Sequence, residues 1–252
     1  IGTNLTNALK SKGKEVHEVD FTGEVLTDPV SFLTLINNDD EFVKNIEMIY
    51  HQGACSDTTC YDPFYMMGMK DDRGTNPKNI YAKSKAMFDE YVSCFLSEKR
   101  TPQIVGLRYF NVYGPWEHKK GKMASVIYQF HQQYKNNKKI KIFKNSENYT
   151  RDFISVEDVV NVNLHFLQNE HLSGIYNCGT GKSRSFYDIA KIMQTYYDFQ
   201  IEEIDMPEAL CGKYQVFTRS DNSRLIEKAF YGNSFLTLEE GISQYVRFLE
   251  SQ

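Results

Sequence analysis

The chain has 252 residues, of which 41% are hydrophobic and 25% are charged, a composition that excludes extended disorder and indicates one large or two small folded domains. Lysine and arginine total 29 against 33 aspartates and glutamates, and the net charge of −4 argues against a general nucleic-acid-binding protein. No apolar run approaches the roughly 18 residues of a membrane span and residues 1–4 do not resemble a signal peptide, so we expect a cytoplasmic protein without a nucleic-acid or membrane partner.

The spacing of apolar residues and of capping residues predicts strands and helices that alternate along most of the chain. In chain order we expect a helix that begins almost at residue 1, a buried strand over 46–51, a helix over 88–95, a strand over 104–110, a helix over 126–134, a strand over 139–143, a helix with a capping box at 155–158, a strand over 174–179, and helices capped by Ser185 and Thr237. Strands separated by helices of this length predict an α/β protein with a parallel sheet.

The five cysteines form no C-x-x-C pair, and no histidine lies beside them at zinc-binding spacing. This pattern predicts reduced thiols, as in cytosolic proteins, and no metal site. The cysteines are Cys55, Cys60, Cys94, Cys178 and Cys211.

Tyr81 and Lys85 form a Y-x-x-x-K pattern at the start of an expected helix. Residues four apart share a helix face, so the phenol and the ammonium can meet one ligand. The ammonium stabilises a phenolate and lowers the tyrosine pKa from about 10, which suits proton exchange with an alcohol or a carbonyl. Tyrosine and lysine are common on helices, so the pattern gains weight only from its surroundings.

Four further stretches provide those surroundings. Residues 51–59 read HQGACSDTT, residues 108–115 read RYFNVYGP and are followed by KKGKMASV at 119–126, residues 143–153 read FKNSENYTRDF, and residues 212–218 read GKYQVFT. Together with the Y-x-x-x-K pattern they resemble the extended short-chain dehydrogenases/reductases that act on nucleotide sugars, and among these the ADP-L-glycero-D-manno-heptose 6-epimerases. The resemblance covers nearly the whole chain.

The resemblance implies a Rossmann-type, doubly wound parallel α/β fold, with a dinucleotide-binding domain over 1–115 and a mainly substrate-binding region over 116–252. Ligands would then lie at the carboxyl ends of the strands. It also implies tightly held NADP, with NAD as a possible substitute, an ADP-heptose substrate and inversion at C6 by transient oxidation. The implied biological setting is lipopolysaccharide core synthesis in a Gram-negative cytoplasm, and the implied assembly is a homopentamer.

The resemblance carries roles onto individual residues. It implies two catalytic bases, Tyr81 and Lys120, with Lys119 as the competing register for the second. The implied cofactor-binding residues are Lys14, Gln52, Gly53, Ala54, Cys55, Ser56, Lys85, Val112 and Lys120. The implied substrate-binding residues are Asn111, Lys122, Gln129, Phe143, Lys144, Asn145, Ser146, Arg151 and Tyr214. The planar fork of the Arg151 guanidinium suits a diphosphate.

Several departures from the family pattern stand beside these matches. The Gly-rich phosphate loop of the family would precede Ile1, and its serine-bearing strand would lie between residues 65 and 80, so we expect segments to be missing from the dinucleotide-binding domain. Gln52, Lys122 and Gln129 replace glutamate, serine and histidine. Two alternatives therefore stay open: another nucleotide-sugar epimerase or dehydratase, such as a UDP-hexose 4-epimerase, and a catalytically silent binding relative.

Residues 179–183, GTGKS, resemble a phosphate-binding loop, but Tyr176 stands where that loop requires glycine. We expect a turn between a strand and a helix there. His118 is expected to be an exposed loop residue.

Overall fold

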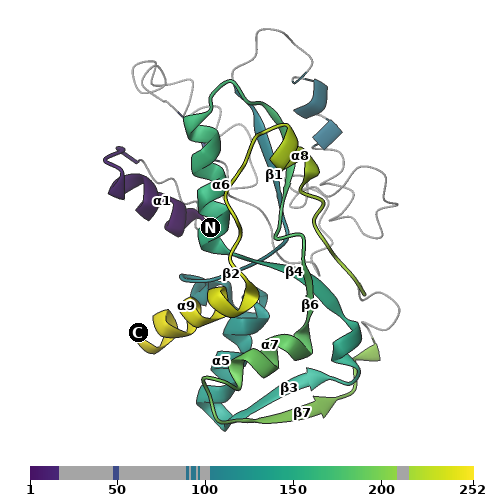
Figure 1. Cartoon of the computed structure of the whole chain (residues 1–252). Helices are drawn as coiled ribbons and strands as arrows, with labels where there is room; N and C mark the ends of the chain where they lie inside the picture. Colours follow the sequence, from purple (N-terminus) through teal and green to yellow (C-terminus); the bar gives the residue numbers. More distant parts are fainter. Residues whose placement is uncertain (17–47, 51–88, 91, 95, 97–102, 209–215) are drawn as a thin grey trace. The chain divides into compact units, whose positions relative to one another are not determined.

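The computed structural model describes residues 1–16, 48–50, 89–90, 92–94, 96, 103–208 and 216–252 (Figure 1). The chain forms two compact units, one of residues 4–102 with Gly2 and one of residues 103–252 with Ile1 and Thr3. Within the described residues, no helix is long and apolar enough to span a membrane.

The smaller unit contains α1 (Gly2–Ser11), where Leu5 and Leu9 lie one turn apart and are buried, as the apolar spacing predicts. Residues 89–90 and 92–94 are helical, in agreement with the helix expected over 88–95. Residues 48–50 form no strand and Ile49 is 55% exposed, so the strand predicted over 46–51 is wrong at these residues. A short apolar run becomes a strand only where a neighbouring strand pairs with its backbone.

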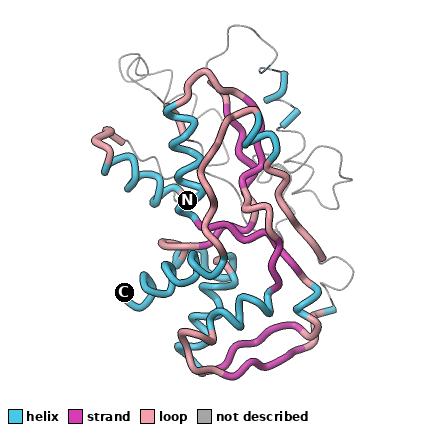
Figure 2. The backbone as a smooth tube through the Cα atoms, viewed as in Figure 1, coloured by secondary structure: helices cyan, strands magenta, loops and turns pink. Residues whose placement is uncertain are grey.

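The larger unit contains seven strands among its described residues. They are β1 (Val105–Tyr109), β2 (Asn111–Tyr113), β3 (Lys139–Phe143), β4 (Thr150–Ser155), β5 (Gly174–Cys178), β6 (Ser183–Ser185) and β7 (Gln200–Ile204). The pairs β1–β5, β2–β4 and β3–β7 are parallel, whereas β6 runs antiparallel to β4. The parallel α/β arrangement expected from the alternating pattern is therefore confirmed in this unit, and the alternation can be followed along the tube in Figure 2.

Five α-helices follow these strands, each begun by a local capping signal or by the preceding turn. They are α5 (Val126–Asn137), α6 (Val156–Gln168), α7 (Phe186–Met193), α8 (Ser223–Glu227) and α9 (Leu238–Glu250). Ser185 and Thr237 form complete capping boxes at α7 and α9. The Ser155 hydroxyl accepts from the Glu157 N–H at α6, but the Asp158 carboxylate accepts from the distant Leu236 N–H. The capping box predicted at 155–158 is therefore only half formed, because Asp158 serves a tertiary contact.

Two apolar clusters hold the larger unit together. In one, buried residues of α5, α7 and α9 pack with β3, around Ile127, Ile140, Ile189 and Ile242. In the other, residues of α6 and α8 pack with β1 and β5, and Figure 1 labels α6, α8 and β1 in the same part of the unit. Burial of these apolar faces is the main stabilising contribution, at roughly 25 cal/mol for each Å² removed from water.

Candidate functional site

A lysine-rich loop leaves the carboxyl end of β2 and leads into α5. Its central part is a 3-10 segment, η2 (His118–Met123), and we refer to residues 118–124 as the lysine loop. Lys119, Lys120 and Lys122 are all exposed there, as is His118 in agreement with expectation. The carboxyl ends of parallel strands are where α/β proteins bind ligands, so the loop presents three ammonium groups beside the expected site.

Gly121 turns the chain in the middle of the lysine loop. Its φ of 53° and ψ of −124° lie in a region that side-chain-bearing residues rarely adopt. The Gln129 side chain donates from Nε2 to the Gly121 carbonyl at 2.9 Å. The structure thus brings Gln129, a predicted substrate residue, to the same loop as Lys120 and Lys122, with its amide engaged by the backbone.

Glu117 precedes the lysine loop and is 3% exposed. Its carboxylate accepts from the Ser125 N–H at 2.7 Å, from the Ser125 hydroxyl at 2.6 Å and from the Tyr245 hydroxyl at 2.8 Å. Burial, followed by the charge of Glu117, raises the pKa of Tyr245, so this phenol stays a donor. Sequence reasoning missed Glu117. Its neighbours in the sequence include His118 and Lys119, so it resembles an exposed loop carboxylate.

Asn111 and Val112 lie in β2, where the exposed Asn111 amide and the half-buried Val112 side chain meet the edge at which ligands bind. Adjacent residues of a strand project to opposite faces, so the two side chains serve different ligands. The apolar Val112 side chain fits the nicotinamide ring that the family resemblance implies, and the exposed Asn111 amide can hydrogen-bond a sugar. Lys14, predicted to contact the cofactor, is exposed in the smaller unit.

The stretch after β3 carries four predicted substrate residues. Phe143 ends the strand, and Lys144 is exposed and pairs with Asp205 at 2.8 Å, a contact that raises the pKa of Lys144. Asn145 takes a left-handed φ of 59° and begins a one-turn 3-10 helix, η3 (Ser146–Asn148). Ser146 is 3% exposed, and its hydroxyl has no hydrogen-bond partner among the described residues. An unsatisfied buried hydroxyl beside predicted ligand contacts is a suitable donor for a bound phosphate or sugar.

Arg151 lies in β4 and is 6% exposed, which sequence composition alone would not predict. Its Nη1 donates to the Thr150 carbonyl at 2.8 Å, and its guanidinium carbon lies 5.7 Å from the centre of the Phe186 ring. The guanidinium is thus held in place by protein contacts rather than extended into solvent. A fork oriented in this way suits bidentate contact with a phosphate.

The neighbouring Asp152 is fully buried and determines the shape of the turn after β5. Its carboxylate accepts from the N–H groups of Thr180, Gly181 and Ser220 at 2.8 to 2.9 Å, and from the Thr180 hydroxyl at 2.7 Å. The glycine-rich turn therefore binds the protein's own carboxylate and not a phosphate. The expected turn is present, with the short strand β6 between it and α7.

The remaining predicted site residues lie outside the described part of the chain. They are Tyr81, Lys85, Gln52, Gly53, Ala54, Cys55, Ser56 and Tyr214. Of the described ones, Gln129 is brought to the lysine loop of Lys120 and Lys122 by its hydrogen bond to the Gly121 carbonyl, and Asn111 and Val112 lie in β2, the strand that precedes this loop. The roles predicted for all of them remain predictions.

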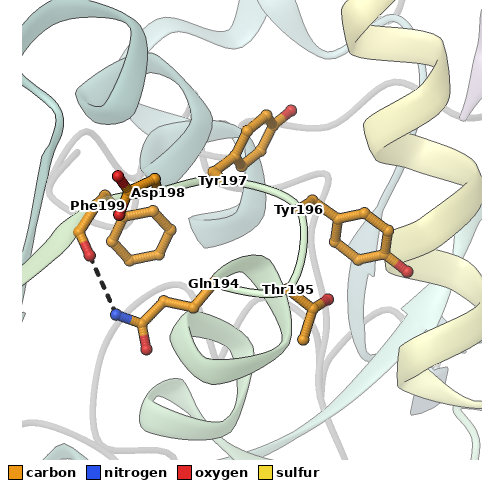
Figure 3. Close-up of a pocket in the computed structure, with 6 residues that line it drawn as sticks. All are labelled: Gln194, Thr195, Tyr196, Tyr197, Asp198 and Phe199. Atoms are coloured by element: carbon orange, nitrogen blue, oxygen red, sulfur yellow. Dashed lines mark hydrogen bonds between the residues drawn. The ribbon is translucent and has the colours of Figure 1, made fainter.

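The surface of the larger unit has hollows, two of which can be described by their lining residues. One, of about 340 Å³, lies in the turn over residues 194–199, where Gln194 donates to the Phe199 carbonyl and the rings of Tyr196 and Tyr197 project from the turn (Figure 3). The other, of about 830 Å³, lies over β3 and β7 and includes Phe143 and the Lys141–Glu202 ion pair. The charged residue that lines the first hollow is Asp198, and those that line the second are Lys139, Lys141 and Glu202. No group of His, Cys, Asp or Glu side chains in the described ranges could hold a metal ion.

Comparison with known proteins places this geometry in context. Residues 66–179 match the NAD dependent epimerase/dehydratase family. An ADP-L-glycero-D-manno-heptose-6-epimerase of Brachyspira hyodysenteriae is 38% identical over 98% of this chain and 88% of its own length. The crystal structure of the ADP-L-glycero-D-manno-heptose-6-epimerase of Helicobacter pylori matches with a TM-score of 0.75 and 27% identity, over 98% of this chain and 82% of that one.

A UDP-glucose 4-epimerase of Thermotoga maritima matches with a TM-score of 0.73 and 19% identity, over 99% of this chain and 95% of that one. At this identity the likeness concerns the fold alone. Together with the H. pylori enzyme it confirms the Rossmann-type α/β fold class expected from the sequence.

Proposed function

This chain belongs to the family of the ADP-L-glycero-D-manno-heptose-6-epimerases, and from that premise we propose that it inverts C6 of ADP-D-glycero-D-manno-heptose to give ADP-L-glycero-D-manno-heptose. It is an epimerase with a nicotinamide cofactor and a nucleotide-sugar substrate. The observation that carries the proposal is the 38% identity with the B. hyodysenteriae enzyme along 98% of the chain. The lysine loop after β2 supports it, because an exposed lysine near the carboxyl end of a parallel strand is available to act as a second base.

Two bases are needed because the C6 hydroxyl points in different directions in the two epimers. In each direction, one base takes the hydroxyl proton as the alcohol becomes a ketone. The ketone then rotates to present its other face to the cofactor, and the other base returns a proton to the same oxygen. When bound, the nicotinamide supplies the transient oxidation and re-reduction of C6. We assign one base to Tyr81 and the other to Lys120. Lys119 and Lys122 are neighbours of Lys120 in the sequence and lie in the same loop.

The remaining described residues would bind and orient the substrate. Arg151 would contact the diphosphate, because its guanidinium is already oriented by the Thr150 carbonyl and the Phe186 ring. The Ser146 hydroxyl, which has no partner in the part of the chain that the structure describes, would donate to the same ligand. Asn111 and Lys122 would contact the sugar, and Val112 the nicotinamide. Water exclusion by such contacts strengthens every charge interaction in the site.

The test of the main proposal is direct. Purified protein loaded with cofactor should convert ADP-D-glycero-D-manno-heptose to its C6 epimer, followed by the change in the NMR signals of the heptose. UDP-glucose is the matched control, and conversion at C4 of that sugar with none of the ADP-heptose would instead favour the UDP-hexose 4-epimerase alternative. Absence of conversion for both substrates in protein that retains cofactor would favour the silent binding relative.

We also propose that the cofactor is NADP, that the assembly is a homopentamer, and that the enzyme serves lipopolysaccharide core synthesis in the cytoplasm. Denaturing the purified protein and weighing the released nucleotide distinguishes NADP from NAD by one phosphate group. Light scattering on the native protein measures the assembly, and a mass other than five chains contradicts the pentamer.

A further inference from the structure

We propose that Glu117, Ser125 and Tyr245 form a clamp that fixes the lysine loop and thereby the position of the Lys120 ammonium. Glu117 and Tyr245 are positioning residues in this assignment, since they act on the reaction through Lys120. The assignment rests on the proposed function in one respect, the role of Lys120 as a base. The order of the loop itself can be measured without any substrate.

The clamp joins the two ends of the lysine loop. Glu117 is the residue before η2, and Ser125 is the residue that caps α5. Both carboxylate oxygens of Glu117 bind Ser125, one through its N–H at 2.7 Å and one through its hydroxyl at 2.6 Å. The loop is therefore closed at its base by a pair of hydrogen bonds to one charged group, which are stronger than those between neutral groups.

Tyr245 ties this closed loop to the body of the larger unit. It lies in the middle of α9, is almost fully buried in the apolar cluster of α5, α7 and α9, and donates to Glu117 Oε1 at 2.8 Å. Nearby, Trp116 contacts the α9 residue Phe248 edge to face, with ring centres 5.2 Å apart. The start of the loop is thus held by a helix that is far away in the sequence.

The Glu117 carboxylate is not needed for packing alone, because burying a charge lowers the stability of the folded state. Removing a charge from water costs several kcal/mol, and a well-packed apolar residue is often as stable or more so. The carboxylate differs from an apolar residue in that it specifies direction, because each of its oxygens accepts from a donor at a defined angle. Such a group is suited to fixing a geometry rather than to adding stability.

The other hydrogen bonds of the lysine loop among the described residues are local or come from the adjoining helix, as does the one from Gln129 Nε2 to the Gly121 carbonyl at 2.9 Å. Its three lysine side chains are exposed, and its own backbone contributes the hydrogen bonds from Lys120 N–H to Glu117 O at 3.0 Å and from Ala124 N–H to Gly121 O at 3.2 Å. A lysine base on a flexible side chain works only if its backbone is held near the reacting hydroxyl, and a misplacement of about 1 Å can cost roughly 100-fold in rate. The clamp provides that restraint.

The test compares two tyrosine-to-phenylalanine variants. Tyr245→Phe removes the hydroxyl that binds Glu117. Tyr197→Phe is the control, because Tyr197 is buried in the same apolar cluster and donates to a carboxylate, that of Glu250, at 2.9 Å, but away from the lysine loop. Both changes remove one hydrogen bond to a carboxylate from the same core, and Tyr197→Phe also removes the contact of its hydroxyl with His131 Nδ1 at 2.9 Å, so the control is the larger perturbation of the core. Glu117→Gln, which keeps the side-chain volume but turns an NH₂ group toward the Ser125 donors, is the second variant.

The first readout is trypsin cleavage of the native, purified protein after Lys119, Lys120 and Lys122, with the fragments identified by mass. Loss of a charged hydrogen bond should raise the population of open loop, so we expect cleavage at these lysines to be roughly 10-fold faster in Tyr245→Phe and in Glu117→Gln. In Tyr197→Phe we expect the wild-type rate. Equal acceleration in Tyr197→Phe, or none in Tyr245→Phe and Glu117→Gln, would overturn the clamp.

The second readout is the epimerase reaction. We expect Tyr245→Phe to lower kcat roughly 10-fold while KM stays within about twofold, because the clamp positions a base and not the substrate. In a Lys120→Met background, Tyr245→Phe should lower the residual rate no further. A further 10-fold loss in that background would contradict action through Lys120. If the wild-type protein shows no epimerase activity but the cleavage rates differ as expected, the proposed function fails and the clamp stands.

Discussion

The lysine loop and the glycine-rich turn after β5 are both organised by a buried carboxylate, but the groups that remain available to a ligand differ between them. Glu117 binds the two ends of its loop and leaves three lysines in solvent. Asp152 binds the N–H groups of Thr180 and Gly181 within the turn itself, so these two donors are engaged by the protein's own carboxylate. The same device therefore builds a candidate site in one place and removes one in the other. What decides the outcome is whether the carboxylate contacts the base of a loop or its tip.

The largest effect should follow from a change in the lysine loop. We expect Lys120→Met to lower epimerase activity by about 10²- to 10⁴-fold, the range typical of a positioned acid–base group. Lys119→Met removes the adjacent exposed ammonium and is the matched control, with activity near that of the wild type. Turnover of ADP-heptose by both folded variants measures the difference. The reverse result would place the base at Lys119, and near-normal activity in both would remove the second base.

A change at Asp152, which binds the glycine-rich turn, should instead lower the free energy of unfolding. Asp152→Asn places an NH₂ group against N–H donors that now meet a carboxylate oxygen, so we expect a loss of roughly 3–5 kcal/mol in the free energy of unfolding. Asp188 also accepts a backbone N–H, from Ser185, but its side chain is 41% exposed, and Asp188→Asn should cost about 1 kcal/mol. Urea denaturation of both variants compares them. A loss below that of Asp188→Asn would mean that Asp152 does not hold the turn.

Neither carboxylate could have been assigned its role from the sequence. The partners of Glu117 and Asp152 include Tyr245 and Ser220, 128 and 68 residues away, and nothing local points to them. Arg151 and Asp152 also disguise β4, because a strand with two charged residues reads as exposed although both are buried. Signals contained within a few residues were read correctly, as in the capping boxes at Ser185 and Thr237 and the strand over 139–143.

A third buried carboxylate sharpens the comparison through pH. Asp158 accepts from the Leu236 N–H at 3.0 Å, and burial raises its pKa to about 6. Its pKa in the unfolded chain is about 3.9, so the folded state holds this proton more tightly. Its contribution to stability is therefore complete below about pH 4 and is lost as the pH rises through 6.

Asp158→Asn removes this titration, so the free energy of unfolding of the variant relative to the wild type should increase by roughly 2 kcal/mol between pH 4 and pH 7. Urea midpoints measured across that range provide the test. Asp221→Asn is the control, because hydrogen bonds from Ser223 lower the pKa of this exposed carboxyl. A constant difference between Asp158→Asn and the wild type from pH 4 to 7 would show that Asp158 ionises normally.

The smallest effect concerns the backbone of the lysine loop. Gly121 has a positive φ of 53°, and a Cβ built on it meets no atom within 4 Å. Gly121→Ala therefore tests backbone strain without a steric clash, and we expect it to cost about 1 kcal/mol, within the range for a side chain forced into such a region. Gly232→Ala is matched, since its Cβ also meets nothing within 4 Å and its φ is not positive in that range. It should change the free energy of unfolding by less than about 0.5 kcal/mol.

The clamp determines how the strain in Gly121→Ala is relieved. If Glu117 and Ser125 hold both ends of the lysine loop, the chain between them has little freedom to turn elsewhere, and the cost should appear in the unfolding midpoint. Breaking the clamp with Tyr245→Phe should then reduce the cost of Gly121→Ala, because the loop can relax, and a double-mutant cycle should give a coupling of roughly 0.5 kcal/mol or more. Strictly additive losses would mean that the loop is already free to move, and that the turn and the lysine loop differ only in which side chains they expose.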